Sequence, residues 1–240
     1  MFKNIIVNAM IVGIVVGAIF GILQNFTTTP IILAAEAYEV SQSTATETSA
    51  HSHGSTAAHS HDADAWAPDD GIERVGYTIL SAILTAIGFA MLTIAAMAAS
   101  GKTSILSGIL FGLAGYISFY VAPSLGLLPE IPGSVAAQLE GRQGWWLMTV
   151  VLTAGGLAAV AFIQSPYRFF GLSLLIVPHI LGAPVPEHHG FANTDPVAVE
   201  ALTALSGDFI VMTAITLFIF WLLLGTASSL VTAKFLKATA

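Results

Sequence analysis

The sequence predicts an all-α fold, a polytopic membrane helical bundle that forms a single domain over residues 1–240. Two observations predict it. First, 55% of the residues are hydrophobic and only 9% are charged, whereas a soluble domain carries about 25% charged residues. Second, five stretches have the length and apolar character of a transmembrane helix, which takes about 20 residues. They lack Asp, Glu, Lys, Arg and His and cover residues 5–23, 75–99, 104–128, 145–163 and 209–231.

A sixth apolar stretch, residues 169–182, is short. As a helix it reaches roughly 21 Å, against a hydrocarbon core of about 30 Å. If it spans, the chain crosses six times, and Lys and Arg divide five to two in favour of the side that holds both termini. If it is re-entrant, the chain crosses five times and the division becomes three to four. Because positive charge collects on the cytoplasmic side, we expect six crossings, with both termini at the cytoplasmic face of the membrane.

The acidic residues follow the same division. In the six-crossing arrangement all 14 Asp and Glu residues, and six of the seven histidines, lie on the outer side. An acidic surface concentrates cations and repels anions, although acidic loops also keep an exported surface soluble. The net charge of −7 argues against nucleic acid as a partner, because phosphate binding needs a basic face. The absence of cysteine excludes disulfides and thiolate metal sites.

Glycines within the spans predict close contacts between helices. Gly13, Gly17 and Gly21 follow one another at intervals of four residues, as do Gly108 and Gly112. This spacing lets helix backbones approach closely in lipid. The contacts can lie within one chain or between copies, so a homo-oligomer remains open.

A histidine-rich segment interrupts the apolar pattern at residues 41–70, where Ser, Thr, Ala, His and Asp dominate. Such a composition cannot bury enough apolar surface to offset the entropy of ordering, so we expect a disordered outer loop. It contains two His-x-His pairs followed by a carboxylate: His51, His53, His59, His61 and Asp62. Imidazole suits Co²⁺, Ni²⁺ and Zn²⁺ without selecting among them. The alternative is a low-complexity tether without metal.

A proline break ends the short apolar stretch. Pro178 removes one helical hydrogen bond, and Gly182 and two further prolines stop the helix. Beside it lies His179, the only Asp, Glu, Lys, Arg or His side chain within the six stretches, since Arg168 lies just before the sixth. Such a residue indicates an ion pathway, and broken helices commonly lie near transported ions. Glu187, His188 and His189 follow directly and complete the expected set of metal ligands. The alternative for His179 is a hydrogen bond to a neighbouring helix.

No enzyme motif accompanies these features. Gly101-Lys102-Thr103 resembles the end of a phosphate-binding loop, but Ala96 stands where that motif needs glycine. We therefore expect neither an enzyme nor a tightly bound cofactor, and a divalent metal, Co²⁺, Ni²⁺ or Zn²⁺, as the cargo or bound ion.

Several motifs give the chain a family resemblance that covers most of its length. They are AEAYE at 35–39, WAPDDGIER at 66–74, GFA at 88–90, GLAG at 112–115, APSLGL at 122–127, PE at 129–130, RQGWW at 142–146 and PHILGAP at 178–184. In these the chain resembles CbtA, a proposed cobalt transporter subunit of bacteria. The resemblance implies about five spans, inner-membrane uptake of cobalt for cobalamin synthesis, and a small histidine-bearing membrane partner, CbtB.

Residues and resemblance together predict a permease subunit for uptake of a divalent transition metal, with cobalt as the expected ion. The alternative is a membrane metal-binding sensor or chaperone that does not itself transport.

Overall fold

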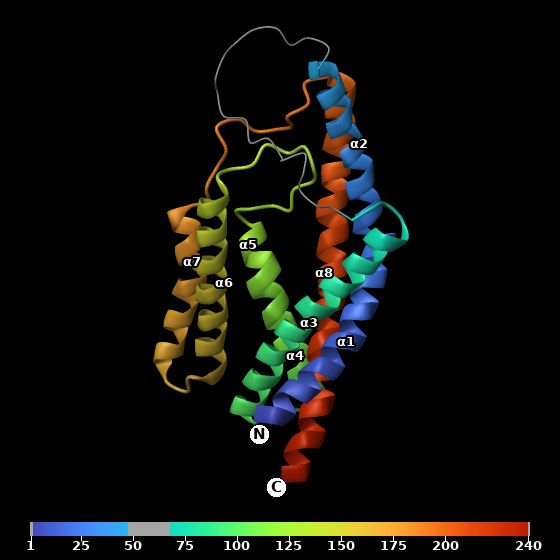
Figure 1. Ribbon diagram of the computed structural model, residues 1–240. Helices are drawn as coiled ribbons and strands as arrows, with labels where there is room; N and C mark the ends of the chain where they lie inside the picture. Colours follow the sequence, from blue (N-terminus) through green and yellow to red (C-terminus); the bar gives the residue numbers. More distant parts are fainter. Residues whose placement is uncertain (1, 48–67, 240) are drawn as a thin grey trace.

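The computed structural model describes residues 2–47 and 68–239, and within them it contains helices and no strand. Figure 1 shows a bundle whose N- and C-termini lie at the same end. The helices are α1 (Phe2–Phe26), α2 (Thr28–Glu47), α3 (Ile72–Ser100), α4 (Ile105–Tyr116), the π-helix η1 (Ile117–Val121), α5 (Ala122–Ser124), α6 (Leu139–Phe162), the 3-10 turn η2 (Pro166–Phe169), α7 (Phe170–Leu181) and α8 (Pro196–Thr239).

The predicted spans are confirmed within the described residues. Five helical segments are long and apolar enough to cross a membrane, and Pro166–Leu181 forms a shorter apolar helix. Helices α1, α4 and α7 run away from the end that holds both termini, and α3, α6 and α8 run toward it (Figure 1). The short α7 thus reverses the direction of α6 and lies against it. The chain therefore alternates in direction as a six-crossing arrangement requires.

The glycine-rich faces pack inside the chain. A Cβ atom on Gly21 would lie 2.7 Å from the Cα atom of Ile79, so α1 rests directly on the backbone of α3. A Cβ atom on Gly108 would lie 2.7 Å from the carbonyl oxygen of Gly225, so α4 rests equally closely on α8. The predicted close contacts are therefore intramolecular. The main apolar core joins α1, α3 and α8 and includes Ile94, Phe220 and Leu224.

The end opposite the termini carries a structured extension. Helix α8 has 44 residues and is about 66 Å long, twice the thickness of the hydrocarbon core. Its first turns pack against α2, and a second apolar cluster there contains Ala35, Ile131 and Leu202. One difference from the sequence-based expectation follows. Residues 41–47 belong to α2 rather than to a disordered loop.

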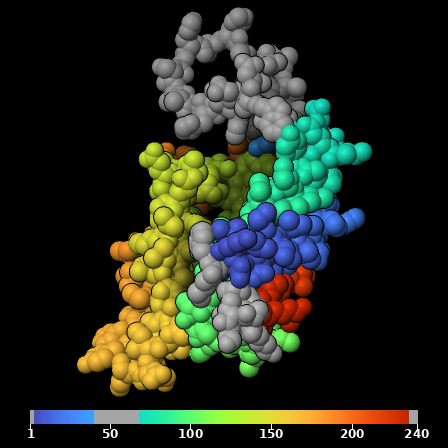
Figure 2. Space-filling model, turned by 60° about the horizontal axis from the view of Figure 1, so that its bottom comes forward, coloured from blue at the N-terminus to red at the C-terminus, as the bar shows by residue number. Residues whose placement is uncertain are grey.

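Helices α6 and α7 form a hairpin beside the remaining bundle. Helix α6 packs on α7 and, on its other side, mainly on η1 and α5, whereas α3 packs mainly on α1 and α8. Figure 2 shows the surface hollowed between the olive α6 region and the blue and teal helices α1 and α3.

Candidate functional site

The predicted proline break lies where α7 meets α6. The carbonyl oxygen of Pro178 accepts a hydrogen bond of 3.1 Å from the indole Nε1 of Trp145 and another of 3.1 Å from the backbone N–H of Gly182. Gly182 has a φ of +80°, a value that only glycine adopts without strain. Helix α7 therefore ends at a fixed point, attached to α6 by an indole.

His179 stands at this end of α7 and is half-buried. Its ring meets the ring of Trp145 edge to face, with 5.9 Å between the centroids. Trp145 itself is buried, and its ring is wedged against Gly126 because a Cβ atom there would come within 2.6 Å of it. The imidazole is thus held against an aromatic ring at the end of the hairpin opposite the chain termini.

The segment after α7 is anchored at its far side as well. Val135 donates a backbone hydrogen bond to Gly190, and Ala192 donates one to Gly133, each 2.9 Å long. Farther along, the side-chain amide of Asn193 donates to the carbonyl oxygen of Tyr38 on α2, at 3.1 Å. Between Gly182 and these anchors, the predicted ligands Glu187, His188 and His189 are exposed. The structure therefore presents them on a short bridge whose two ends are fixed.

The described side chains do not by themselves make a metal site. Among residues 2–47 and 68–239, no three His, Asp or Glu side chains lie close enough together to hold an ion. His179 and the segment Glu187–His189 thus share one end of the molecule but form no closed set of ligands there. The other predicted ligands lie outside the described residues: His51, His53, His59, His61 and Asp62.

Three carboxylates at the same end form ion pairs with arginines. Glu36 on α2 forms a two-point ion pair with Arg74 at the start of α3, with one contact of 2.9 Å, and Arg74 also contacts Asp70 at 3.1 Å. Arg142 pairs with Glu130 at 2.5 Å. These pairs join α2 to α3 and α6 to the loop before it, so they hold elements together at this end.

Sequence reasoning missed the central role of Trp145. An aromatic pair at positions 145 and 146 is typical of the membrane interface, which places both side chains there. Only Trp146 is exposed, whereas Trp145 is buried and donates a hydrogen bond into α7. Trp145 and Pro178 are 33 residues apart, so no local sequence pattern predicts their hydrogen bond. The sequence marked the two segments only through the RQGWW and PHILGAP motifs of the family resemblance.

The chain was compared with known protein families, curated proteins and solved structures. A model of the CbtA family, described as "probable cobalt transporter subunit (CbtA)", matches residues 2–233, nearly the whole chain. No curated protein and no solved structure matches the chain. The described residues include five helices long and apolar enough to cross a membrane, which suits a transport subunit, and the match extends from α1 into the last turns of α8. The chain therefore belongs to the CbtA family of probable cobalt transporter subunits.

Proposed function

We propose that this chain is the permease subunit through which a divalent transition metal, Co²⁺ as the cargo, enters the bacterial cytoplasm. The observation that carries the proposal is the contact between His179 and Trp145 beside the Pro178 break. It holds a metal-binding side chain at the outer end of an apolar helix pair, directly before the exposed histidines 188 and 189. Family membership supports the transport of cobalt.

The distribution of charge supports an inward direction. The end with both termini carries the described basic residues Lys3, Lys102, Arg168 and Lys234. The opposite end carries Arg74 and Arg142, the predicted ligands 187–189, and carboxylates such as Asp195 and Glu200. We place the basic end in the cytoplasm, as the distribution of Lys and Arg favours. A potential of −100 mV inside then favours the inward movement of a divalent cation by about 4.6 kcal/mol.

In this proposal the histidine-rich loop collects the ion from outside. Its ligands are His51, His53, His59, His61 and Asp62. The ion then passes to His188 and His189, with Glu187 as an oxygen ligand, and on to His179.

A separate subunit fits the family description, which names a transporter subunit. We propose the small histidine-bearing membrane protein CbtB as that partner, within the same lipid bilayer. Neither catalysis nor a resident cofactor has a part in this proposal.

The test is metal uptake by cells and by proteoliposomes containing the purified chain, with and without the partner. His179→Phe keeps a ring against Trp145 but removes the metal-binding nitrogens, and we expect it to reduce Co²⁺ uptake at least tenfold. Ser173→Ala, on an exposed face of the same helix, is the control and should leave uptake unchanged. Normal Co²⁺ uptake by the His179→Phe variant would contradict the proposed role of His179 in transport. If no transition metal accumulates even with the partner, the chain is a sensor or chaperone instead.

A further inference from the structure

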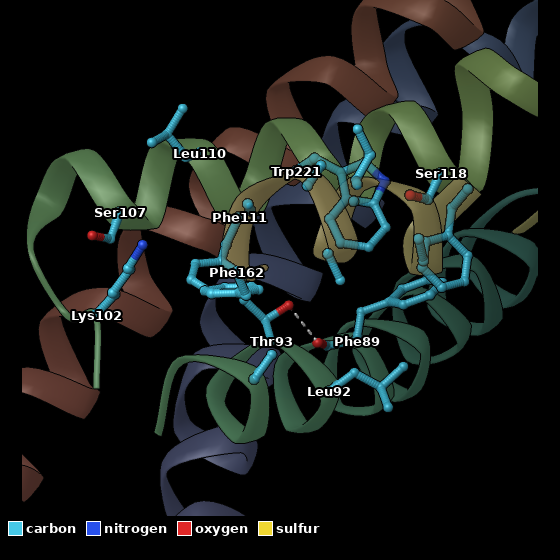
Figure 3. Close-up of a pocket in the computed structure, with 18 residues that line it drawn as sticks. Phe89, Leu92, Thr93, Lys102, Ser107, Leu110, Phe111, Ser118, Phe162 and Trp221 are labelled. Carbon is cyan, nitrogen blue, oxygen red and sulfur yellow. Dashed lines mark hydrogen bonds between the residues drawn. The ribbon is translucent and has the colours of Figure 1, made fainter. Parts of the chain in front are cut away.

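A cavity of about 320 Å³ lies between α3, α4 with η1, and α6, and none of the described histidines lines it. Figure 3 shows its walls, with Phe89 and Leu92 on one side, Phe111 and Phe162 on another, and Trp221 of α8 between Phe111 and Ser118. An apolar cavity of about 150 Å³ stays dry and takes up benzene. This one is about twice that size and lies within membrane-spanning segments.

The space exists because the facing residues are small. Ala96 on α3 and Ala154 and Ala158 on α6 all line the cavity and are exposed to it. Helices α3 and α6 each pack mainly on other elements, so nothing larger fills the space between them. An apolar void at this depth loses dispersion contacts along its whole lining. A hydrocarbon chain from the bilayer would restore these contacts without any change in the backbone.

One end of the cavity carries a positive charge. Lys102, in the turn between α3 and α4, lines the cavity, and its Nζ atom lies 5.0 Å from the centroid of the Phe162 ring. No ion pair of Lys102 is present among the described residues. The hydroxyl of Ser107 beside it is engaged with Ser104 at 2.9 Å. Lys102 is therefore the cation available to an anion at this end.

We propose that this cavity binds an anionic phospholipid of the surrounding bilayer. The phosphate contacts Lys102, and one acyl chain lies between α3 and α6 and reaches toward Trp221. The chemistry of the lining carries the assignment, because an apolar channel with a single cation at its mouth complements an amphiphile with one negative charge. Basic sites between transmembrane helices bind anionic headgroups in this way. The lipid would brace the α6–α7 hairpin against the rest of the bundle.

The experiment counts bound lipid on the full-length chain. Protein purified in detergent is exposed to phosphatidylglycerol and phosphatidylcholine, and native mass spectrometry measures the amount of each that remains bound. We expect one phosphatidylglycerol per chain, retained in preference to phosphatidylcholine. Lys102→Gln should lower this preference about fivefold, the effect of one basic residue near an anionic lipid surface.

Variants whose larger side chains fill the cavity provide a second test of lipid binding. Ala158→Phe, or the gentler Ala96→Leu from the opposite wall, should abolish retention of both lipids while circular dichroism shows an intact helical fold. Ala95→Phe and Arg168→Gln are the controls, because both residues are exposed and lie outside the cavity. Unchanged phosphatidylglycerol retention in both filled variants would overturn the proposal, as would equal retention of the two lipids by the unaltered chain. A photoreactive group at position 158 that captures a polypeptide and no lipid would overturn it too.

Discussion

The indole Nε1 of Trp145 and the carbonyl oxygen of Pro178 are joined by a buried hydrogen bond of 3.1 Å. The two residues belong to α6 and α7, and the bond lies one residue before His179 along the chain. Because Pro178 also accepts from Gly182, the same oxygen sets both the end of α7 and its position on α6. The orientation of His179 therefore depends on a side chain of the neighbouring helix.

Replacing the indole tests this dependence. Trp145→Phe keeps a ring beside His179 but removes the donor, and we expect a loss of about 0.5–1.5 kcal/mol in stability. Uptake of Co²⁺ should fall by more than the loss of folded protein explains, because the end of α7 is no longer fixed. Trp146→Phe, the same change on the exposed neighbour, is the control. Thermal unfolding in detergent and transport are measured together, and identical behaviour of the two variants would contradict the expectation.

The hairpin itself depends on two facing glycines. A Cβ atom on Gly171 would lie 2.5 Å from the carbonyl oxygen of Gly156 and 2.9 Å from the Cβ atom of Ala159. Gly171→Ala should therefore force α7 away from α6 and cost about 1–3 kcal/mol. Gly155→Ala, one position from Gly156, meets nothing within 4 Å and should be neutral or stabilising, since alanine favours helix. Thermal unfolding of both variants checks this, and equal effects would show that the contact does not limit packing.

The membrane-spanning helices were predictable because lipid imposes a simple rule, a long apolar run without charge. Helix α2 and the first turns of α8 follow no such rule. Their sequences mix polar and apolar residues, and they are stabilised by packing on each other around Ala35 and Leu202. Helices outside the membrane owe most of their stability to such tertiary contacts, which local composition does not reveal.

The features of the candidate site were likewise only partly predictable from the sequence. Pro178 and Gly182 mark a helix end by their backbone chemistry alone, so the position of His179 at that end was foreseeable. The hydrogen bond of the Trp145 indole and the backbone pairing of residues 133–135 with residues 190–192 were not, because they join segments far apart in the chain. The ion pair of Glu36 with Arg74 also joins distant segments, and the sequence alone places Glu36 only among the acidic residues of the outer side.

A double-mutant cycle measures the interaction energy of the ion pair between Glu36 and Arg74. Glu36→Gln, Arg74→Gln and the double variant should show a coupling of about 0.5–1 kcal/mol, since both side chains are partly exposed and solvent screens them. The cycle of Asp70→Asn with Arg74→Gln is the control and should give a coupling near zero, because Asp70 is largely exposed. Unfolding in detergent at low salt supplies the free energies. If Glu36→Gln abolishes uptake while Arg74→Gln does not, Glu36 serves the cargo rather than the fold.

The histidine-rich loop should bind metal as an isolated peptide. A peptide covering residues 48–67 should bind Co²⁺, Ni²⁺ or Zn²⁺ near pH 7.5 and release it near pH 5.5. Only neutral imidazole is a ligand, and free imidazole side chains gain a proton below about pH 6.5. Titration calorimetry at both pH values measures this, with a peptide whose four histidines are replaced by Gln as the control. Equal heats of metal binding from the two peptides would show that the histidines bind no metal and would favour the alternative, a low-complexity tether.

The number of crossings decides whether His188 and His189 lie on the same side of the membrane as the histidine-rich loop. The chain has no cysteine, so single cysteines can be labelled without background. With six crossings, an impermeant maleimide applied to intact cells from outside should reach His53→Cys and His189→Cys. Ser165→Cys, between α6 and α7, and Lys237→Cys should react only after the membrane is opened.

A re-entrant α7 gives the opposite pattern after residue 182, because α7 would return to the cytoplasmic side and α8 would then cross in the opposite direction. His189→Cys would then be protected and Lys237→Cys labelled in intact cells, while His53→Cys would still react. Labelling that places positions 53 and 189 on opposite sides of the membrane would contradict the proposed transfer of metal from the histidine-rich loop to His188 and His189. The alternating directions of α6, α7 and α8 (Figure 1) favour labelling of both positions from the same side.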